Sequence, residues 1–107
     1  MVNIFKQFFG GSESVDLKSI IEEGAFLVDV RNPGELAEGH VKGSTNIPLD
    51  KVSSRLAQFK DKKNIIVFCR SGSRSGQAKT ILEQNGFTNV VNGGTWEDVN
   101  QLVKTSK

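Results

Sequence analysis

The only cysteine of the chain lies between two arginines, at the start of a loop of small residues. The stretch at 68–76 reads FCRSGSRSG and follows a short apolar run. A loop that leads from a strand into a helix can direct several backbone amides, and the positive end of the helix, toward one point. Arg70 and Arg74 add two full positive charges. The pattern predicts that the Cys69 thiol ionises more readily than a free thiol, whose pKa is about 8.5.

The loop geometry depends on Gly72, which can adopt backbone angles that a side chain would forbid. With this glycine in place, the amides of 69–75 can converge on the sulfur or on an anionic group attached to it. The plainer alternative is a buried, inert thiol at the end of a strand, with solvated arginines around it.

Two chemistries fit a thiolate held in this way: phosphate-ester hydrolysis through a phosphocysteine, and sulfur transfer through a persulfide. Four residues separate Cys69 from Arg74, one fewer than in cysteine phosphatases. The shorter loop favours one sulfur atom over a phosphoryl group, and the loop contains no obvious general acid for an alcohol leaving group. A Cys-x-x-Cys redox site is excluded, because Ser71 and Gly72 follow the cysteine.

The composition excludes several other functions. The chain has 107 residues, of which 36% are hydrophobic and 24% charged, and this predicts one folded domain rather than disorder. The net charge is only +2 and the basic residues are spread out, so no nucleic-acid partner is expected. One cysteine and one histidine, His40, are too few for a protein zinc site. We therefore expect no metal and no cofactor.

Residues 1–12 are expected to form a leader before a single domain at 13–107. Phenylalanines at helical spacing in this leader either pack on the domain, fray, or contact a membrane surface or a partner; they are Phe5, Phe8 and Phe9. No apolar run approaches the roughly 18 residues of a membrane span. The N-terminus also lacks the apolar core and cleavage site of a signal peptide. We therefore expect a cytoplasmic protein without a membrane span.

Strands that are apolar throughout alternate with helical segments along the chain. The segments AFLVDV and NIIVFC are typical of a parallel sheet that helices cover on both faces. We expect strands at 25–30, 44–49, 64–69 and 89–91, and helices at 15–23, 51–59, 75–84 and 95–103, with a short helix after a turn at 32–35. This alternation predicts a three-layer α/β/α fold with a mainly parallel sheet. Ligands of such sheets bind beyond the carboxyl ends of the strands, where Cys69 is expected.

Several polar residues are expected to bound these elements. Ser14, Asp50 and Thr95 are the predicted N-caps of the helices that follow them. Asn85-Gly86 is expected to end the third long helix, and the NGG segment at 92–94 is expected to form a tight turn.

Together with the cysteine loop, two further motifs make the chain resemble a rhodanese-like domain of the single-domain type, over about 15–103. LVDVRNPGELAEGHVKGSTNIPL at 27–49 resembles the first signature of the family, and VNGGTWEDV at 91–99 resembles its closing Gly-Gly-x-x-x-Trp segment. Trp96 follows the glycines sooner than is usual, so we expect a change in the last helix cap or in the packing of this core tryptophan. The resemblance implies a parallel sheet flanked by helices, with the active loop after a central strand.

The resemblance also implies roles for individual residues. Cys69 would be the nucleophile that holds a sulfane sulfur as a persulfide. Asp29 and Arg31 would form a structural ion pair beneath the site, with donor binding by Arg31 as an alternative. His40 would fix a loop by hydrogen bonding, or act as an acid or base. The residues that would stabilise the persulfide or attract donor and acceptor are Arg70, Ser71, Gly72, Ser73, Arg74 and Ser75.

We therefore expect a sulfurtransferase that moves a sulfane sulfur from a small anionic donor or a persulfide to cyanide or a thiol. Two-domain enzymes of the family carry a thiosulfate-binding arginine near the position of Glu35. Its absence here favours a persulfide on a protein or small thiol as the donor. An alternative is a sulfur carrier that serves a dedicated protein partner with little small-molecule turnover. A third reading, a phosphatase or arsenate reductase of the same fold, is disfavoured by the short loop.

Overall fold

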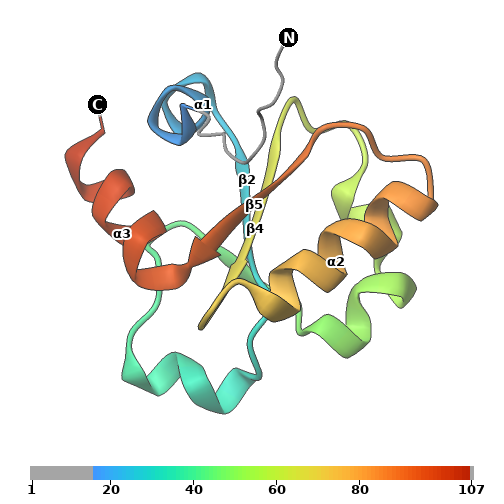
Figure 1. The fold of residues 1–107 in the computed structure, drawn as a ribbon, viewed down its shortest axis with the longest axis horizontal. Coiled ribbons are helices and arrows are strands. Elements are labelled where there is room, and N and C mark those ends of the chain that lie inside the picture. Colours follow the sequence, from blue (N-terminus) through green and yellow to red (C-terminus); the bar gives the residue numbers. More distant parts are fainter. Residues whose placement is uncertain (1–15, 107) are drawn as a thin grey trace, which may run out of the picture.

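The computed structural model describes residues 16–106, in which four parallel strands form one sheet. The strands lie in the order β3–β2–β4–β5. Figure 1 shows β2, β4 and β5 in the middle of the fold, with α1 and α3 on one side and α2 on the other. Their bounds are Phe26–Asp29 for β2, Thr45–Asn46 for β3, Ile65–Cys69 for β4 and Val90–Thr95 for β5. Because β4 lies between β2 and β5, the prediction that the cysteine loop follows a central strand is confirmed.

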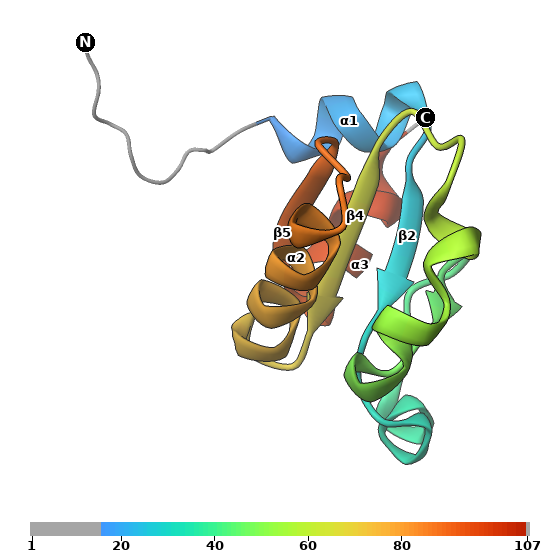
Figure 2. The ribbon, with the colours of Figure 1, turned by 90° about the vertical axis from the view of Figure 1, so that its right-hand side faces the viewer.

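Helices cover both faces of this sheet. The α-helices are α1 (Leu17–Glu23), α2 (Ser73–Gln84) and α3 (Trp96–Thr105), and the 3-10 helices are η1 (Pro33–Glu38), η2 (Leu49–Ser54) and η3 (Leu56–Phe59). Side chains of α1 and α3 pack on one face, and those of α2, η2 and η3 pack on the other. Figure 2 shows α2 in front of the sheet and α3 behind it. The three-layer α/β/α prediction is confirmed.

The buried strand β4 contributes side chains to both hydrophobic clusters of the core, one on each face of the sheet. Its side chains alternate between the two faces, as the period of a strand requires. Ile65, Val67 and Cys69 join the cluster under α2, whereas Ile66 and Phe68 join the cluster under α1 and α3. The Cys69 side chain is therefore directed to the α2 face, toward the helix that its own loop begins.

One predicted helix is wrong. The segment expected as one helix at 51–59 forms η2 and η3, with a break at Arg55, whose φ is −123°. The hydroxyl of Ser54 donates to the carbonyl oxygen of Lys51 at 2.9 Å, a side-chain bond that competes with continued α-helix. Asp50 lies inside η2, which follows Pro48, so it is not the cap.

The predicted turn at 92–94 is also wrong, because β5 continues through both glycines to Thr95. The pairing with β4 shifts between Val67 and Phe68, so that Gly93 is an extra residue, a β-bulge. A Cβ on Gly93 would lie 2.9 Å from side-chain carbons of Ile66 and Val99. Close packing, rather than a reversal of the chain, is what requires glycine here.

Other element ends differ by a few residues. The helix predicted from residue 75 begins at Ser73, with Gly72 as its N-cap, and the strand predicted at 44–49 is confined to β3. At the far end of α2, the amides of Gly86 and Phe87 bond back to the carbonyls of Glu83 and Leu82, which confirms the predicted stop. The Thr95 hydroxyl accepts from the Asp98 amide at 3.1 Å, which confirms that cap.

At the N-terminal end of the described residues, α1 begins at Leu17. Asp16 caps this helix by accepting from the Ser19 amide. The leader at 1–12, its phenylalanines and the predicted cap Ser14 lie outside the described residues. Within 16–106, the helices are too short or too polar for any of them to cross a bilayer.

Candidate active site

Cys69 is the last residue of β4, and its side chain is fully buried. The backbone then turns sharply at Gly72, whose φ of +95° is left-handed. This turn directs the Gly72 N–H to the Cys69 Sγ, at 3.0 Å. A Cβ on Gly72 would also approach the Gly94 Cα to 3.5 Å. That distance is an ordinary van der Waals contact, so the left-handed backbone angle is what favours glycine at this position.

The surroundings lower the pKa of the Cys69 thiol below its ordinary value. Burial acts in the opposite direction, because it disfavours the charged form. Hydrogen bonding between the sulfur and the Ser75 hydroxyl, together with hydrogen bonds from the amides of Ser75, Ser71 and Gly72, outweighs it. The start of α2, directed at the sulfur, adds positive partial charge. These amides form a cradle for negative charge on the sulfur or on a group attached to it.

Both arginines of the loop are paired with glutamates of η1. Arg74 binds the Glu35 carboxylate through two nitrogens, at 2.7 and 3.0 Å. Arg70 binds Glu38 at 2.5 Å in a more exposed pair. Both arginines were predicted from the sequence to attract donor and acceptor, and neither glutamate partner was identified. The available signal was the i, i+3 spacing of the two glutamates, which places both on one side of a short helix.

Asp29 and Arg31 form a buried ion pair next to the loop. The Arg31 side chain is fully buried; its Nη2 lies 2.7 Å from the Asp29 carboxylate. The same guanidinium donates to the carbonyl oxygens of Glu35 and Gly39, and it stacks 4.7 Å from the ring of Trp96. Arg31 thus connects the end of β2 to the first turn of η1 and to its C-cap, Gly39. Because the Arg31 side chain is fully buried, none of its atoms is exposed to a sulfur donor. A supporting role of this pair in catalysis stays a prediction.

Asn92 is a contact of the loop that the sequence analysis missed. Its Oδ1 accepts from the hydroxyl of Ser75 at 2.7 Å, and its Nδ2 donates to the carbonyl oxygen of Gly72 at 3.1 Å. Ser75 in turn lies 3.5 Å from the Cys69 sulfur. Asn92 precedes the bulge of β5, and its side chain shares the α2 face with the thiol. Because residues 92–94 were predicted to form a turn, nothing in the sequence indicated that the Asn92 side chain would lie next to Ser75.

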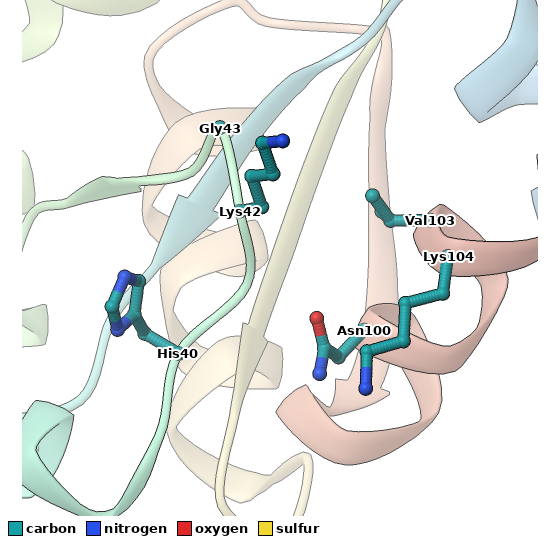
Figure 3. A pocket seen from close by; sticks show the side chains of 6 residues that line it. All are labelled: His40, Lys42, Gly43, Asn100, Val103 and Lys104. Atoms are coloured by element: carbon teal, nitrogen blue, oxygen red, sulfur yellow. The ribbon is translucent and has the colours of Figure 1, made fainter.

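The remaining predicted residues lie farther from the sulfur. The side chains of Ser71 and Ser73 are exposed. Ser71 contributes to the cradle through its amide, whereas the Ser73 amide donates to the Ser71 hydroxyl oxygen at 3.4 Å. His40 is exposed and makes no side-chain hydrogen bond to another described residue. It lines a separate hollow of about 580 Å³ between its own loop and α3 (Figure 3), with Lys42, Gly43, Asn100, Val103 and Lys104. No residue of the cysteine loop lines this hollow, so the geometry does not bring His40 to the thiol.

No group of three or more metal-binding side chains occurs in 16–106. The arrangement instead joins one buried thiol, an amide cradle and two paired arginines at the carboxyl ends of parallel strands. Chemically, it can stabilise a thiolate and an anionic sulfur species attached to it.

Comparison with known proteins links this geometry to a family. The profile of the rhodanese-like domain matches residues 13–97. Thiosulfate sulfurtransferase PspE of Escherichia coli K12 is 43% identical over 74 residues, which cover 67% of this chain and 71% of that protein. A sulfurtransferase of Allochromatium vinosum is 33% identical over 81 residues, 76% of each chain. A solved rhodanese with anions from E. coli has a TM-score of 0.64 and 42% identity, over 70% of this chain and 91% of that one.

Proposed function

This chain belongs to the rhodanese-like domain family, and on that premise we propose that it is a sulfurtransferase whose sulfur is carried on Cys69. The observation that carries the proposal is the Gly72 amide at 3.0 Å from the Cys69 Sγ, within a cradle that lowers the pKa of the thiol. A thiolate is the reactive form of cysteine. Cys69 is therefore the proposed nucleophile, and the amides of 70–75 are its proposed anion-binding groups.

The reaction follows a ping-pong cycle. The Cys69 thiolate attacks the sulfane sulfur of the donor, and a new S–S bond forms. The bond between that sulfur and the rest of the donor breaks, and the donor leaves with the electron pair, as sulfite or as a thiolate. An acceptor, cyanide or a thiol, then attacks the outer sulfur. The S–S bond to Cys69 breaks, its electron pair returns to the thiolate, and thiocyanate or a new persulfide leaves.

The paired arginines support a persulfide, on a protein or a small thiol, as the donor. Glu35 and Glu38 neutralise the two positive side chains that would otherwise attract a dianion such as thiosulfate. A persulfide concentrates at most one negative charge on its sulfur, and the neutral amides of the cradle suffice to stabilise it. We therefore propose slow turnover with thiosulfate and faster loading from a persulfide.

Intact mass spectrometry of the reduced protein tests this function. The protein is incubated with thiosulfate or glutathione persulfide and its intact mass is measured. The mass is measured again after cyanide is added. We expect a gain of one sulfur atom and its loss as thiocyanate, with faster gain from the persulfide. The Cys69→Ser variant is the control and should gain nothing. Loading that discharges only to a protein acceptor would move the assignment to a sulfur carrier, and no loading from any donor would refute the proposal.

A further inference from the structure

Asn92 has a side-chain amide whose orientation is fixed by two backbone groups. Its Oδ1 accepts from the Gly94 N–H at 2.9 Å, and its Nδ2 donates to the Gly72 carbonyl oxygen at 3.1 Å. A flipped amide would place donor against donor and acceptor against acceptor at these two contacts. The oxygen of the Asn92 amide is therefore the atom that meets Ser75.

This orientation determines the position of the single hydroxyl hydrogen of Ser75. The Oδ1 of Asn92 carries no hydrogen, so the contact of 2.7 Å requires Ser75 to donate. The Ser75 oxygen then presents a lone pair to the Cys69 sulfur, 3.5 Å away, and can accept from the S–H of the thiol. In the thiolate the sulfur also needs a donor. Asn92 and the thiolate thus compete for one hydrogen.

We infer that Asn92 is a positioning residue that holds the Ser75 hydrogen away from Cys69 and so limits the fraction of this cysteine present as thiolate. The inference rests on the proposed function only in taking Cys69 as the reacting thiol. The side chain of Asn92 is hydrogen-bonded to Ser75, Gly72 and Gly94 and not to the sulfur, so it acts through Ser75. By setting the thiolate fraction, it sets the rate at which the sulfur attacks a donor.

The charges around the thiol are separate from this effect. They come from the cysteine loop, the end of β2, η1 and the start of α3; the groups are Arg70, Arg74, Asp29, Arg31, Glu35, Glu38 and Glu97. The strand that carries Asn92 contributes no charged side chain. A neutral replacement of Asn92 therefore leaves every one of these charges in place.

The Asn92→Ala variant removes the competing acceptor. Asn92 is exposed, so water can enter, and water can donate as well as accept and does not fix the hydroxyl hydrogen. We expect the Cys69 pKa to fall by roughly half a unit to one unit, the scale of one hydrogen bond, with a roughly three- to tenfold larger thiolate fraction below that pKa. The Asn92→Asp variant, a stronger and negatively charged acceptor, should move the pKa upward.

The experiment measures the ultraviolet absorbance of the thiolate against pH, together with the rate of alkylation by iodoacetamide. The single cysteine makes both signals specific, and neither needs sulfur transfer. The matched control is Asn89→Ala, because Asn89 lies just before β5 and its amide bonds to the backbone of Lys62 and Lys63. The same Asn92→Ala change is also made in a Ser75→Ala background, where the proposed competition cannot occur.

Three results decide the inference. A lower Cys69 pKa in Asn92→Ala, absent in the Ser75→Ala background and in the control, supports it. A higher pKa in Asn92→Ala would mean that Asn92 only holds the amide cradle in shape, and it would overturn the inference. An equal shift with and without Ser75 would also overturn it. A protein that titrates as expected but never gains sulfur would refute the proposed function and leave this inference standing.

Discussion

The carboxylate of Glu35 binds both terminal nitrogens of Arg74, at 2.7 and 3.0 Å, across 39 positions of the chain. This bidentate geometry fixes the guanidinium at the mouth of the cysteine loop. It also cancels the charge that would otherwise attract an anionic donor. Removing the Glu35 carboxylate should therefore restore the attraction between Arg74 and an anionic donor.

The Glu35→Gln variant should turn over thiosulfate faster. An unpaired Arg74 can attract the dianion, and we expect kcat/KM to rise by roughly three- to tenfold at low salt. Glutathione persulfide should respond less, because its charges are spread over a tripeptide and include a positive ammonium group, whereas both negative charges of thiosulfate lie on one small ion. Steady-state kinetics with both donors at two ionic strengths measure the effect. The matched variant is Glu38→Gln, whose pair with Arg70 is more exposed and should matter less. Equal increases for both donors would contradict this explanation.

The Arg74→Ala variant should raise the pKa of the Cys69 thiol, since it removes a positive charge that interacts with the thiolate. Turnover with anionic donors should fall in the same variant. The absorbance titration of the thiolate gives the pKa directly. The Arg74→Lys variant retains the positive charge without the bidentate geometry, so its Cys69 pKa should lie between those of the wild type and of Arg74→Ala. An unchanged titration in Arg74→Ala would show that the amides alone stabilise the thiolate.

The Glu35–Arg74 pair should persist to acidic pH. The hydrogen bond from Arg74, with that from the Asn32 amide, lowers the pKa of Glu35 from 4.5 to about 2. A carboxylate whose pKa is lowered in the folded state stabilises the fold above its unfolded pKa, and this contribution is lost as the pH falls through the folded value. We therefore expect the stability difference between wild type and Glu35→Gln to be constant above about pH 5 and to shrink toward pH 2. Urea unfolding at several pH values measures it. If the difference in unfolding free energy between wild type and Glu35→Gln disappeared already near pH 4, strong pairing of Glu35 with Arg74 would be refuted.

The Arg31→Met variant should be strongly destabilised. It leaves the buried Asp29 carboxylate without its partner, a change that typically costs about 3–5 kcal/mol. It also removes the donors to the carbonyl oxygens of Glu35 and Gly39. Urea unfolding of the reduced protein gives the free energy. The double variant Asp29→Leu/Arg31→Met removes both charges and should recover part of the loss. A loss below about 1 kcal/mol in Arg31→Met would show that the pair contributes little.

The sheet and its layers could be predicted because they depend on local patterns. The apolar runs that became β2 and β4 are short and rich in β-branched residues, which is typical of strands covered on both faces. Their alternation with helices indicates parallel pairing. The loop could be predicted for the same reason, since Cys69, Gly72 and the start of α2 are close in sequence. The break at Arg55 was missed because the spacing of Val52, Leu56 and Phe59 fits one α-helix as well as two 3-10 helices.

The contacts around the thiol were harder to predict because they join distant segments. Glu35 and Arg74 meet only when η1 and α2 reach the same end of the sheet. Asn92 was missed because a Gly-Gly pair reads as a turn, whereas close packing of Gly93 against Ile66 keeps the strand going. The face on which a side chain lies next to a bulge cannot be read from alternation alone.

The burial of Cys69 at the end of β4 has a consequence for the lifetime of a stored sulfur. The chain contains no second cysteine, so a persulfide on Cys69 has no neighbouring thiol that could reduce it from within. Under the proposed function, a loaded protein would therefore discharge only when an acceptor reaches this buried sulfur, and the dwell time of the sulfur would depend on the acceptor concentration.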